Sequence, residues 1–217
     1  MQSETPLSSS RAGSLPLVGG RLCLDYANTT SGRGGPRRQE HLRRYAHLIA
    51  WARHVGLLGD EEAARLSAAA KADPAGAEAA LAEAVQLREA IHGVLLPIAR
   101  GERHDPAAFV ELNRVLGEGM GRARLVVSGE AYRWGWEPCQ GERPSLCAPL
   151  WPIARSAAEL LISRWRKRVR ECPGEHCGWL FLDETKNASR RWCEMEVCGS
   201  RAKMQRYRER RRRRSVE

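Results

Sequence analysis

The sequence predicts a mostly helical α+β protein, in which a helical N-terminal domain with one β-hairpin precedes a small metal-bound module. Three observations support this fold class. Apolar residues recur at helical spacing through most of the first 165 residues, a short stretch near residue 130 alternates as strands do, and two equally spaced cysteine pairs follow residue 170. A chain of 217 residues can bury one sizeable core in addition to such a module.

Four helices are expected from this periodicity. The first covers residues 42–55, before a glycine, and the second follows Asp60, a suitable N-cap. The third and fourth begin at the Asp-Pro pairs 73–74 and 105–106, because aspartate caps a helix and proline suits its first position. Pro97 is expected to kink or end the third helix.

Residues 125–136 predict the hairpin, with a turn at 128–130. Trp134 and Trp136 fall on one face of its second strand and are expected to pack against a helical layer, a base-stacking platform being the alternative. Residues 150–171 then read as one helix that runs directly into the first cysteine pair.

The segment around residues 22–26 alternates like a strand but also has helical spacing, so its structure stays undecided. Its polar side chains Asp25, Asn28 and Thr29 could line a pocket. Alternatively, they lie at the end of a helix or strand, with their polar groups bonded to the backbone.

Two cysteine pairs, Cys172/Cys177 and Cys193/Cys198, have four residues between the members of each pair. Such loops bring two sulfurs together, and two of them facing each other supply the four thiolates of a tetrahedral zinc site. Core thiols or two disulfides are the alternatives, although the sequence has no secretory signal that would favour disulfides. One structural Zn²⁺ is therefore predicted.

A short strand is expected after Cys177, and a basic helix without a breaker after Cys198. A knuckle, a hairpin and a helix that begins at the second pair indicate a treble-clef-like finger, whereas a zinc ribbon would end in strands. On the helix, Met204 and Tyr207 are expected to pack back on the finger while the arginines face outward.

The segment CGWLFLDETKNASRRWCEMEVCGSRAK resembles the CGNR-type zinc finger of bacterial proteins. The tetrapeptide that names this finger reads Cys198-Gly199-Ser200-Arg201 here, so serine replaces asparagine without affecting the metal ligands. The stretch GRLCLDYANTT and the helices after it resemble the ABATE domain that precedes this finger. The resemblance implies a stress-induced transcription regulator.

Charge is unevenly distributed. From Arg164 onward there are 17 Lys/Arg against 8 Asp/Glu, whereas the first 163 residues hold 19 against 18. This asymmetry indicates an acidic partner, and with a zinc-anchored helix it favours nucleic acid, expected to be double-stranded DNA. The candidate contacts are Arg190, Arg191, Arg201, Lys203, Arg206, Arg208 and Arg210.

The expected organisation is a disordered segment over residues 1–16, an ABATE-like domain over 17–165 and the finger over 166–217. The expected function is DNA-binding transcriptional regulation, with the N-terminal domain as a sensor of an unknown small-molecule effector or as an assembly unit. A zinc-stabilised protein-interaction adaptor and an RNA-binding protein are the alternatives.

Catalysis is not expected, because the sequence lacks a phosphate loop, a nucleophile elbow and a HExxH motif. No apolar run approaches the length of a membrane span. Together with the unpaired Cys23, Cys139 and Cys147, this favours a cytoplasmic protein without membrane contact.

Overall fold

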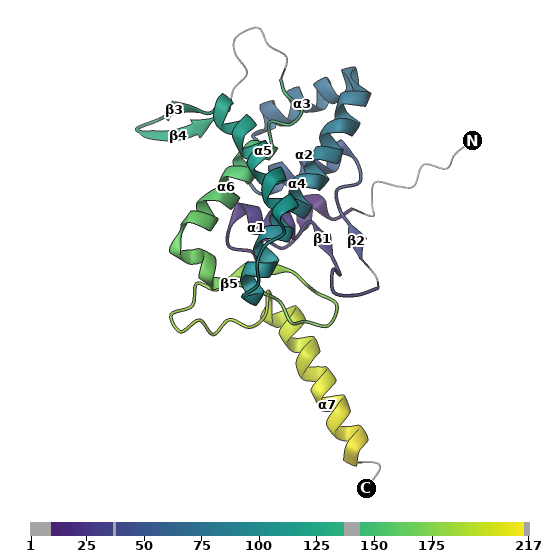
Figure 1. The fold of residues 1–217 in the computed structure, drawn as a ribbon. Coiled ribbons are helices and arrows are strands. Elements are labelled where there is room, and N and C mark those ends of the chain that lie inside the picture. The colour runs from purple at the N-terminus through teal and green to yellow at the C-terminus, as the bar shows by residue number, and fades with distance from the viewer. Residues whose placement is uncertain (1–9, 37, 137–143, 215–217) are drawn as a thin grey trace, which may run out of the picture.

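The computed structural model describes residues 10–36, 38–136 and 144–214, with side chains as far as residue 212. A helical body carries a projecting C-terminal helix at one end (Figure 1). The helices of the described part are α1 (Leu22–Ala27), α2 (Tyr45–His54), α3 (Asp60–Ala72), α4 (Pro74–Arg100), α5 (Pro106–Arg122), α6 (Leu150–Ile162) and the projecting α7 (Ser200–Arg214).

The strands form three antiparallel pairs of two strands each. They are β1 (Thr30–Ser31) with β2 (Gln39–Glu40), β3 (Arg124–Ser128) with β4 (Ala131–Gly135), and β5 (Val169–Glu171) with β6 (Leu180–Leu182). The predicted class, mostly helical α+β with one longer hairpin and a C-terminal finger, is confirmed.

The long helix α4 lies at the centre of the core. Its apolar face, which includes Leu87, Ile91 and Leu95, is fully buried, and α5 and α6 pack around it. The short α1 joins α4 through the Tyr26 hydroxyl, which donates a hydrogen bond to the carbonyl of Ala84 at 2.6 Å. The undecided segment around residues 22–26 is therefore helical.

The capping predicted at the two Asp-Pro pairs is confirmed, whereas Asp60 is the first residue of α3 and not its N-cap, which is Gly59 without a side-chain cap. The Asp73 carboxylate accepts from the Gly76 N–H at 2.8 Å, and that of Asp105 accepts from the Ala107 N–H at 2.9 Å. Pro97, however, does not end α4, which continues to Arg100 and stops at Gly101 with φ 75°. The carbonyl of Gly93, which Pro97 cannot bond, faces the N–H of Asp105 at 3.5 Å instead.

The expectation of disorder over residues 1–16 does not hold for its second half. Ala12 and Leu15, in and beside the 3-10 helix η2 (Ala12–Ser14), are buried in the main core, and the Ser10 hydroxyl donates to the His41 carbonyl at 2.7 Å. Residues 1–9 lie outside the described part, as does Cys139.

The helix expected over residues 150–171 is also shorter than predicted. It ends at Ile162, because the Ser163 hydroxyl donates to the Leu160 carbonyl at 2.8 Å and accepts from the Trp165 N–H at 3.2 Å. A 3-10 helix, η3 (Arg164–Arg168), and β5 follow. The body therefore enters the finger through a strand.

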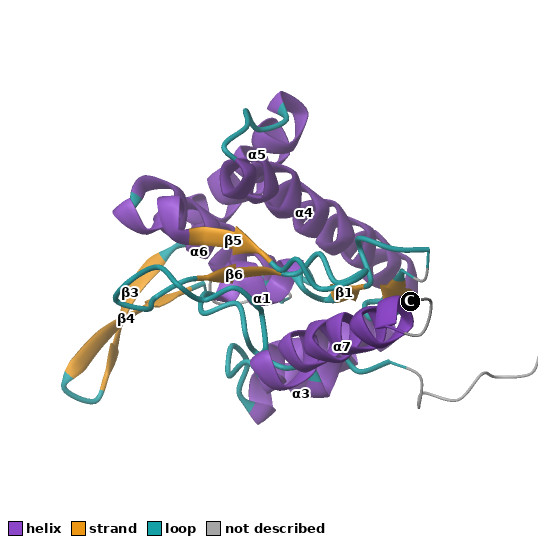
Figure 2. Ribbon diagram, turned by 90° about the horizontal axis from the view of Figure 1, so that it is seen from below, coloured by secondary structure: helices purple, strands orange, loops and turns teal. Residues whose placement is uncertain are grey.

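The β3–β4 hairpin packs as predicted. The guanidinium carbon of Arg155 on α6 lies 4.5 Å from the ring centroid of Trp134 and 5.9 Å from that of Trp136. Seen from below, β5 and β6 lie beside α1 and α6, close to the base of α7 (Figure 2). In the described part, no helix has the length and apolar character that a bilayer span requires.

Candidate zinc centre and basic helix

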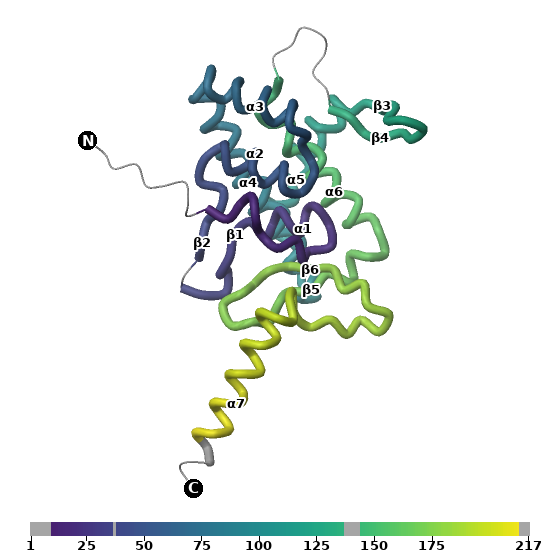
Figure 3. The backbone as a smooth tube through the Cα atoms, turned by 180° about the vertical axis from the view of Figure 1, so that it is seen from behind, coloured from purple at the N-terminus to yellow at the C-terminus, as the bar shows by residue number. Residues whose placement is uncertain are grey.

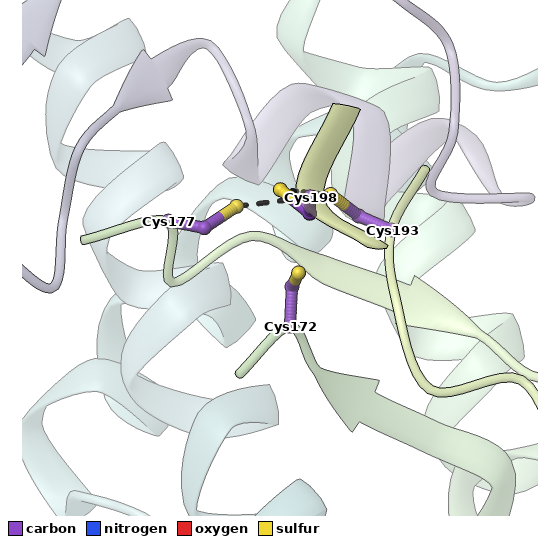
Figure 4. A group of neighbouring side chains, drawn as sticks. All are labelled: Cys172, Cys177, Cys193 and Cys198. Carbon is purple, nitrogen blue, oxygen red and sulfur yellow. Dashed lines mark hydrogen bonds between the residues drawn. The ribbon is translucent and has the colours of Figure 1, made fainter. Parts of the chain in front are cut away.

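The four predicted cysteines converge on one point between the finger segments (Figure 4). All four Sγ atoms lie within 4.8 Å of one another. The Cys177–Cys193 and Cys193–Cys198 sulfur separations are 3.7 and 3.6 Å. Zinc–sulfur bonds of about 2.3 Å in a regular tetrahedron give sulfur–sulfur edges of about 3.8 Å. The cluster therefore has the size of a four-thiolate zinc site.

The first pair lies in the turn of the β5–β6 hairpin. The Cys172 N–H donates to the Trp179 carbonyl at 2.8 Å, and the Cys177 N–H donates to the Gly174 carbonyl at 2.9 Å. A Cβ at Gly174 would approach the Cys198 sulfur to 3.0 Å, so this position favours glycine. The strands thus flank the knuckle and hold its sulfurs against the second pair.

The second pair forms the base of α7. Cys198 lies in the π-helical turn η4 (Met195–Gly199), which leads directly into Ser200, and its N–H donates to the Glu194 carbonyl at 3.0 Å. Two of the four sulfurs are therefore fixed to the start of the basic helix. The first knuckle thus lies within the hairpin, and the second leads into a helix and not into strands, as the finger predicted from the sequence requires.

The chemistry of the cluster fits zinc. Hydrogen bonds from Cys177 and Cys193 lower the pKa of the Cys172 thiol. The pKa values of Cys177 and Cys193 are raised by their hydrogen bonds to Cys172 and by burial. Bound Zn²⁺ would supply two positive charges and stabilise all four thiolates. Because cysteines would occupy every coordination position, such an ion has a structural role.

The three polar residues proposed for a pocket are instead bonded to the backbone. Asn28 contacts both polar groups of Leu180, and the Thr29 hydroxyl donates to the Tyr26 carbonyl at 2.8 Å. The Asp25 carboxylate accepts from the Gly19 N–H at 2.7 Å, although burial raises its pKa to about 6. These contacts correspond to the alternative interpretation of the segment.

The basic residues of α7 lie along a helix that leaves the body (Figures 1 and 3). Five of the predicted contacts have exposed side chains there: Arg201, Lys203, Arg206, Arg208 and Arg210. Met204 and Tyr207 are 52% and 57% exposed, so the expectation that they pack back on the finger is wrong. Met204 still lines an open concavity with Glu175 and Val197 of the finger, but it is not covered by them.

The two loop arginines differ from each other. Arg191 is exposed, with its guanidinium carbon 5.0 Å from the Trp192 ring centroid. Arg190 instead donates to the carbonyls of Val18 and Cys193 at 2.8 and 2.6 Å. Its guanidinium is thus occupied within the protein, in a setting that the prediction of a nucleic-acid contact did not anticipate.

Sequence reasoning missed the residues that attach the finger to the body. The Trp179 indole N–H donates to the Thr30 carbonyl at 2.9 Å. A Cβ at Gly35 would overlap the His176 ring at 2.4 Å, so the loop after β1 lies directly on the first knuckle. The only sequence signal was the glycine-rich composition of residues 32–35, which permits close backbone approach.

A closed four-cysteine site at the base of a basic helix defines a zinc-finger protein whose metal is structural. Residues 168–211 match the CGNR zinc finger. Residues 20–164 match ABATE, described as "Putative stress-induced transcription regulator", and the chain belongs to this family. Both resemblances inferred from the sequence are confirmed. No curated protein matches the chain.

Proposed function

We propose that this protein is a transcriptional regulator that binds double-stranded DNA through α7. The observation that carries the proposal is the position of that helix. It starts two residues after a predicted zinc ligand, Cys198, and extends from the body with exposed cationic side chains. A charged run is often a solvated tail, but a zinc-fixed base gives this one a defined direction.

The geometry of α7 suits a DNA groove. Its 15 residues would span about 22 Å at the rise of an α-helix, and the major groove admits such a helix. Lys203, Arg206 and Arg210 lie on one side, and Arg201 and Arg208 lie on the other. Cations on two sides can contact the phosphates that border the groove on each strand.

Two other functions are less well supported by α7. A helix that binds a protein groove usually presents an apolar stripe, whereas Met204 and Tyr207 are the only large apolar side chains among its described residues. Double-stranded RNA has a major groove too narrow for side chains to read. Both remain outcomes of the test below.

The N-terminal domain would act as the sensor or assembly unit. It supports the finger directly, since Leu180 and Leu182 of β6 belong to the same buried cluster as the helical core. A change in the packing of α1 would therefore shift the β5–β6 hairpin, which holds two of the predicted zinc ligands. A small-molecule effector is one agent that could cause it.

Selection from a random duplex library, with single-stranded RNA as competitor, tests the proposal. We expect enrichment of duplex sequences by the zinc-loaded full chain, and binding that weakens steeply as salt rises. If no duplex sequence is enriched and the protein binds only the RNA competitor, it is an RNA-binding protein. Absence of binding to both nucleic acids would leave the protein-interaction adaptor.

Variants of α7 separate base reading from phosphate attraction. Arg201→Ala, close to the zinc, is expected to cost about 1–3 kcal/mol on a selected site and to flatten the preference among sites. Truncation after Glu209 should weaken all sequences alike and reduce the salt dependence. Preference that survives both Arg201→Ala and Lys203→Ala would exclude α7 as the sequence reader.

A further inference from the structure

A second basic surface lies on the finger, away from α7. It is a concavity between η3, the start of β5 and the loop after β6. Five cations and one aromatic residue line most of this basic concavity: Arg164, Trp165, Lys167, Arg168, Arg170 and Lys186. No acidic side chain lines it.

Two of the five cations, Arg168 and Arg170, are held in place by hydrogen bonds to backbone carbonyls. Arg168 Nη1 donates to the Thr185 carbonyl at 2.8 Å, which ties η3 to the loop after β6. Arg170 Nη1 donates to the Lys167 carbonyl at 2.9 Å. Each guanidinium keeps further N–H groups for an external acceptor. The two arginines are thus positioned before any ligand arrives.

The opposite wall is also rigid. The buried Asp183 carboxylate accepts from the Thr185 N–H and hydroxyl at 3.0 and 2.6 Å, and from the Arg190 N–H at 3.1 Å. These bonds fix the turn that carries Lys186 beside the arginines. The concavity therefore has defined walls on both sides.

The positive charge of the concavity is only partly offset within the described residues, because one carboxylate, that of Asp183, stands against five cations. None of its five cations forms an ion pair with a carboxylate of the described residues, although the buried Asp183 carboxylate attracts Arg168 electrostatically. Two acidic residues that flank the concavity in the sequence pair elsewhere. Glu171 pairs with Arg100 at 2.8 Å and Glu184 pairs with Arg21 at 2.9 Å. Clustered cations with little counter-charge attract an anion.

The concavity and α7 lie at the same end of the molecule. In Figures 1 and 3, the loop after β6 and the base of α7 both face the lower side, and the β3–β4 hairpin and α3 lie at the other end. A duplex that takes α7 into its groove would pass under this face. A surface of five cations from two segments suits successive phosphates better than one small anion.

We propose that the basic concavity binds backbone phosphates of the same DNA duplex that α7 enters, as a second, sequence-independent contact. The inference rests on the proposed function and adds a second site to it. Contacts at two places on one duplex would fix how the body is oriented, because α7 alone could rotate about its axis.

Neutralising the most exposed cations tests this inference. The variant Arg164→Gln/Lys167→Gln/Lys186→Gln removes three charges without touching the arginines that bond the walls. The matched control, Arg65→Gln/Lys71→Gln/Arg133→Gln, removes three exposed charges from α3 and β4 at the other end. Fluorescence anisotropy on zinc-loaded full chains would use random duplexes of about 30 and about 10 base pairs in a salt series.

On the long duplex, we expect the triple variant to lose about 2–3 from the slope of log K against log salt. At physiological salt its affinity should fall about tenfold or more relative to the control. On the short duplex, which covers only the α7 footprint, the two variants should bind alike. Zinc content and melting temperature verify folding, and Lys167→Gln/Lys186→Gln serves if the triple variant loses zinc.

Equal slopes for the triple variant and the control on the long duplex would overturn the inference while leaving the α7 proposal intact. If truncation of α7 has no effect and the triple variant abolishes binding, the concavity binds DNA and the assignment of α7 is wrong. Wild-type protein that binds neither duplex would overturn both.

Discussion

The Asn28 side chain pairs with both backbone polar groups of Leu180. Its Nδ2 donates to the Leu180 carbonyl at 2.8 Å, and its Oδ1 accepts from the Leu180 N–H at 2.9 Å. Beside it, the Leu182 N–H donates to the Gly19 carbonyl at 2.8 Å. Residues of the N-terminal domain thus close the free edge of β6, so that the finger and the helical body share one folded unit.

Removing the Asn28 amide should destabilise the whole protein. Asn28→Ala leaves a buried N–H and a buried carbonyl without partners, which costs about 2–4 kcal/mol for the two groups. Urea denaturation of the zinc-loaded protein measures it. The control is Asn113→Ala, which removes an exposed amide bond within α5 and should change stability by less than about 0.5 kcal/mol. Equal losses in both variants would show that the contact with β6 contributes nothing.

Zinc removal should release α7 without unfolding the β5–β6 hairpin. An isolated finger of this size would depend on its metal, and chelation would then unfold everything after about residue 170. In the structure, however, Val169, Leu180 and Leu182 are fully buried in the main core, whereas Cys193 and Cys198 belong to a separate small cluster.

Hydrogen exchange with and without a strong chelator distinguishes the two expectations. We expect amides after Cys193 to lose protection and helical circular dichroism to fall, while amides of residues 169–171 and 180–182 keep their protection. Cys193→Ser should behave as chelated protein does. Loss of protection throughout the hairpin would show that the metal, not the body, maintains it.

The features that the sequence predicted correctly depend on residues close together in the chain. The zinc ligands and the Asp-Pro helix starts depend on residues a few positions apart, so spacing and capping chemistry identify them. The Asn28–Leu180 pairing joins residues 152 positions apart and leaves no periodic trace. The orientation of α7 likewise depends on where the second knuckle points. A helical pattern that lets Met204 pack inward cannot show that the finger leaves this side chain half exposed.

His92 of α4, which is partly buried, should make stability depend on pH. Burial lowers the pKa of His92 to about 4, aided by Arg33, Arg38 and Arg100 and opposed by Glu89, and its Nε2 has no hydrogen-bond partner in the described part. The unfolded chain protonates this group below about pH 6.5. The contribution to stability is therefore full above that pH and is lost as the pH falls toward 4, by about 2 kcal/mol at pH 5 and about 3 kcal/mol at pH 4.

Denaturation midpoints at pH 7 and pH 5 measure this loss in wild-type protein and in His92→Gln. The comparison between the two proteins matters, because protonation of the thiolates also weakens zinc binding in both. We expect His92→Gln to lose less stability on acidification. His104→Gln, which replaces an exposed histidine, should lose as much as wild type. Identical acid sensitivity in all three would mean that His92 does not titrate as described.

Arg190 and Arg191 are adjacent, but their substitutions should affect different properties: Arg190 should affect stability, and Arg191 should affect DNA binding. The Arg190 guanidinium also donates to the Leu182 and Trp192 carbonyls, each at 3.2 Å, and lies 4.5 Å from the Phe181 ring centroid. A lysine ammonium cannot reproduce this planar set of donors. Arg190→Lys should therefore cost about 2–4 kcal/mol and lower zinc retention. Arg191→Gln should leave both unchanged and reduce the salt slope of DNA binding by about 1.

Zinc content, melting temperature and duplex affinity, measured on both variants, decide between a structural and a DNA-contacting role for each arginine. The bonds of Arg190 to Val18 and Cys193 join the start of the described chain to a metal ligand, so their loss should loosen the second knuckle and, through it, the base of α7. DNA affinity of Arg190→Lys should then recover when excess zinc restores the site. Lost affinity with full zinc content and an unchanged melting temperature would instead make Arg190 a DNA contact, as the sequence alone predicts.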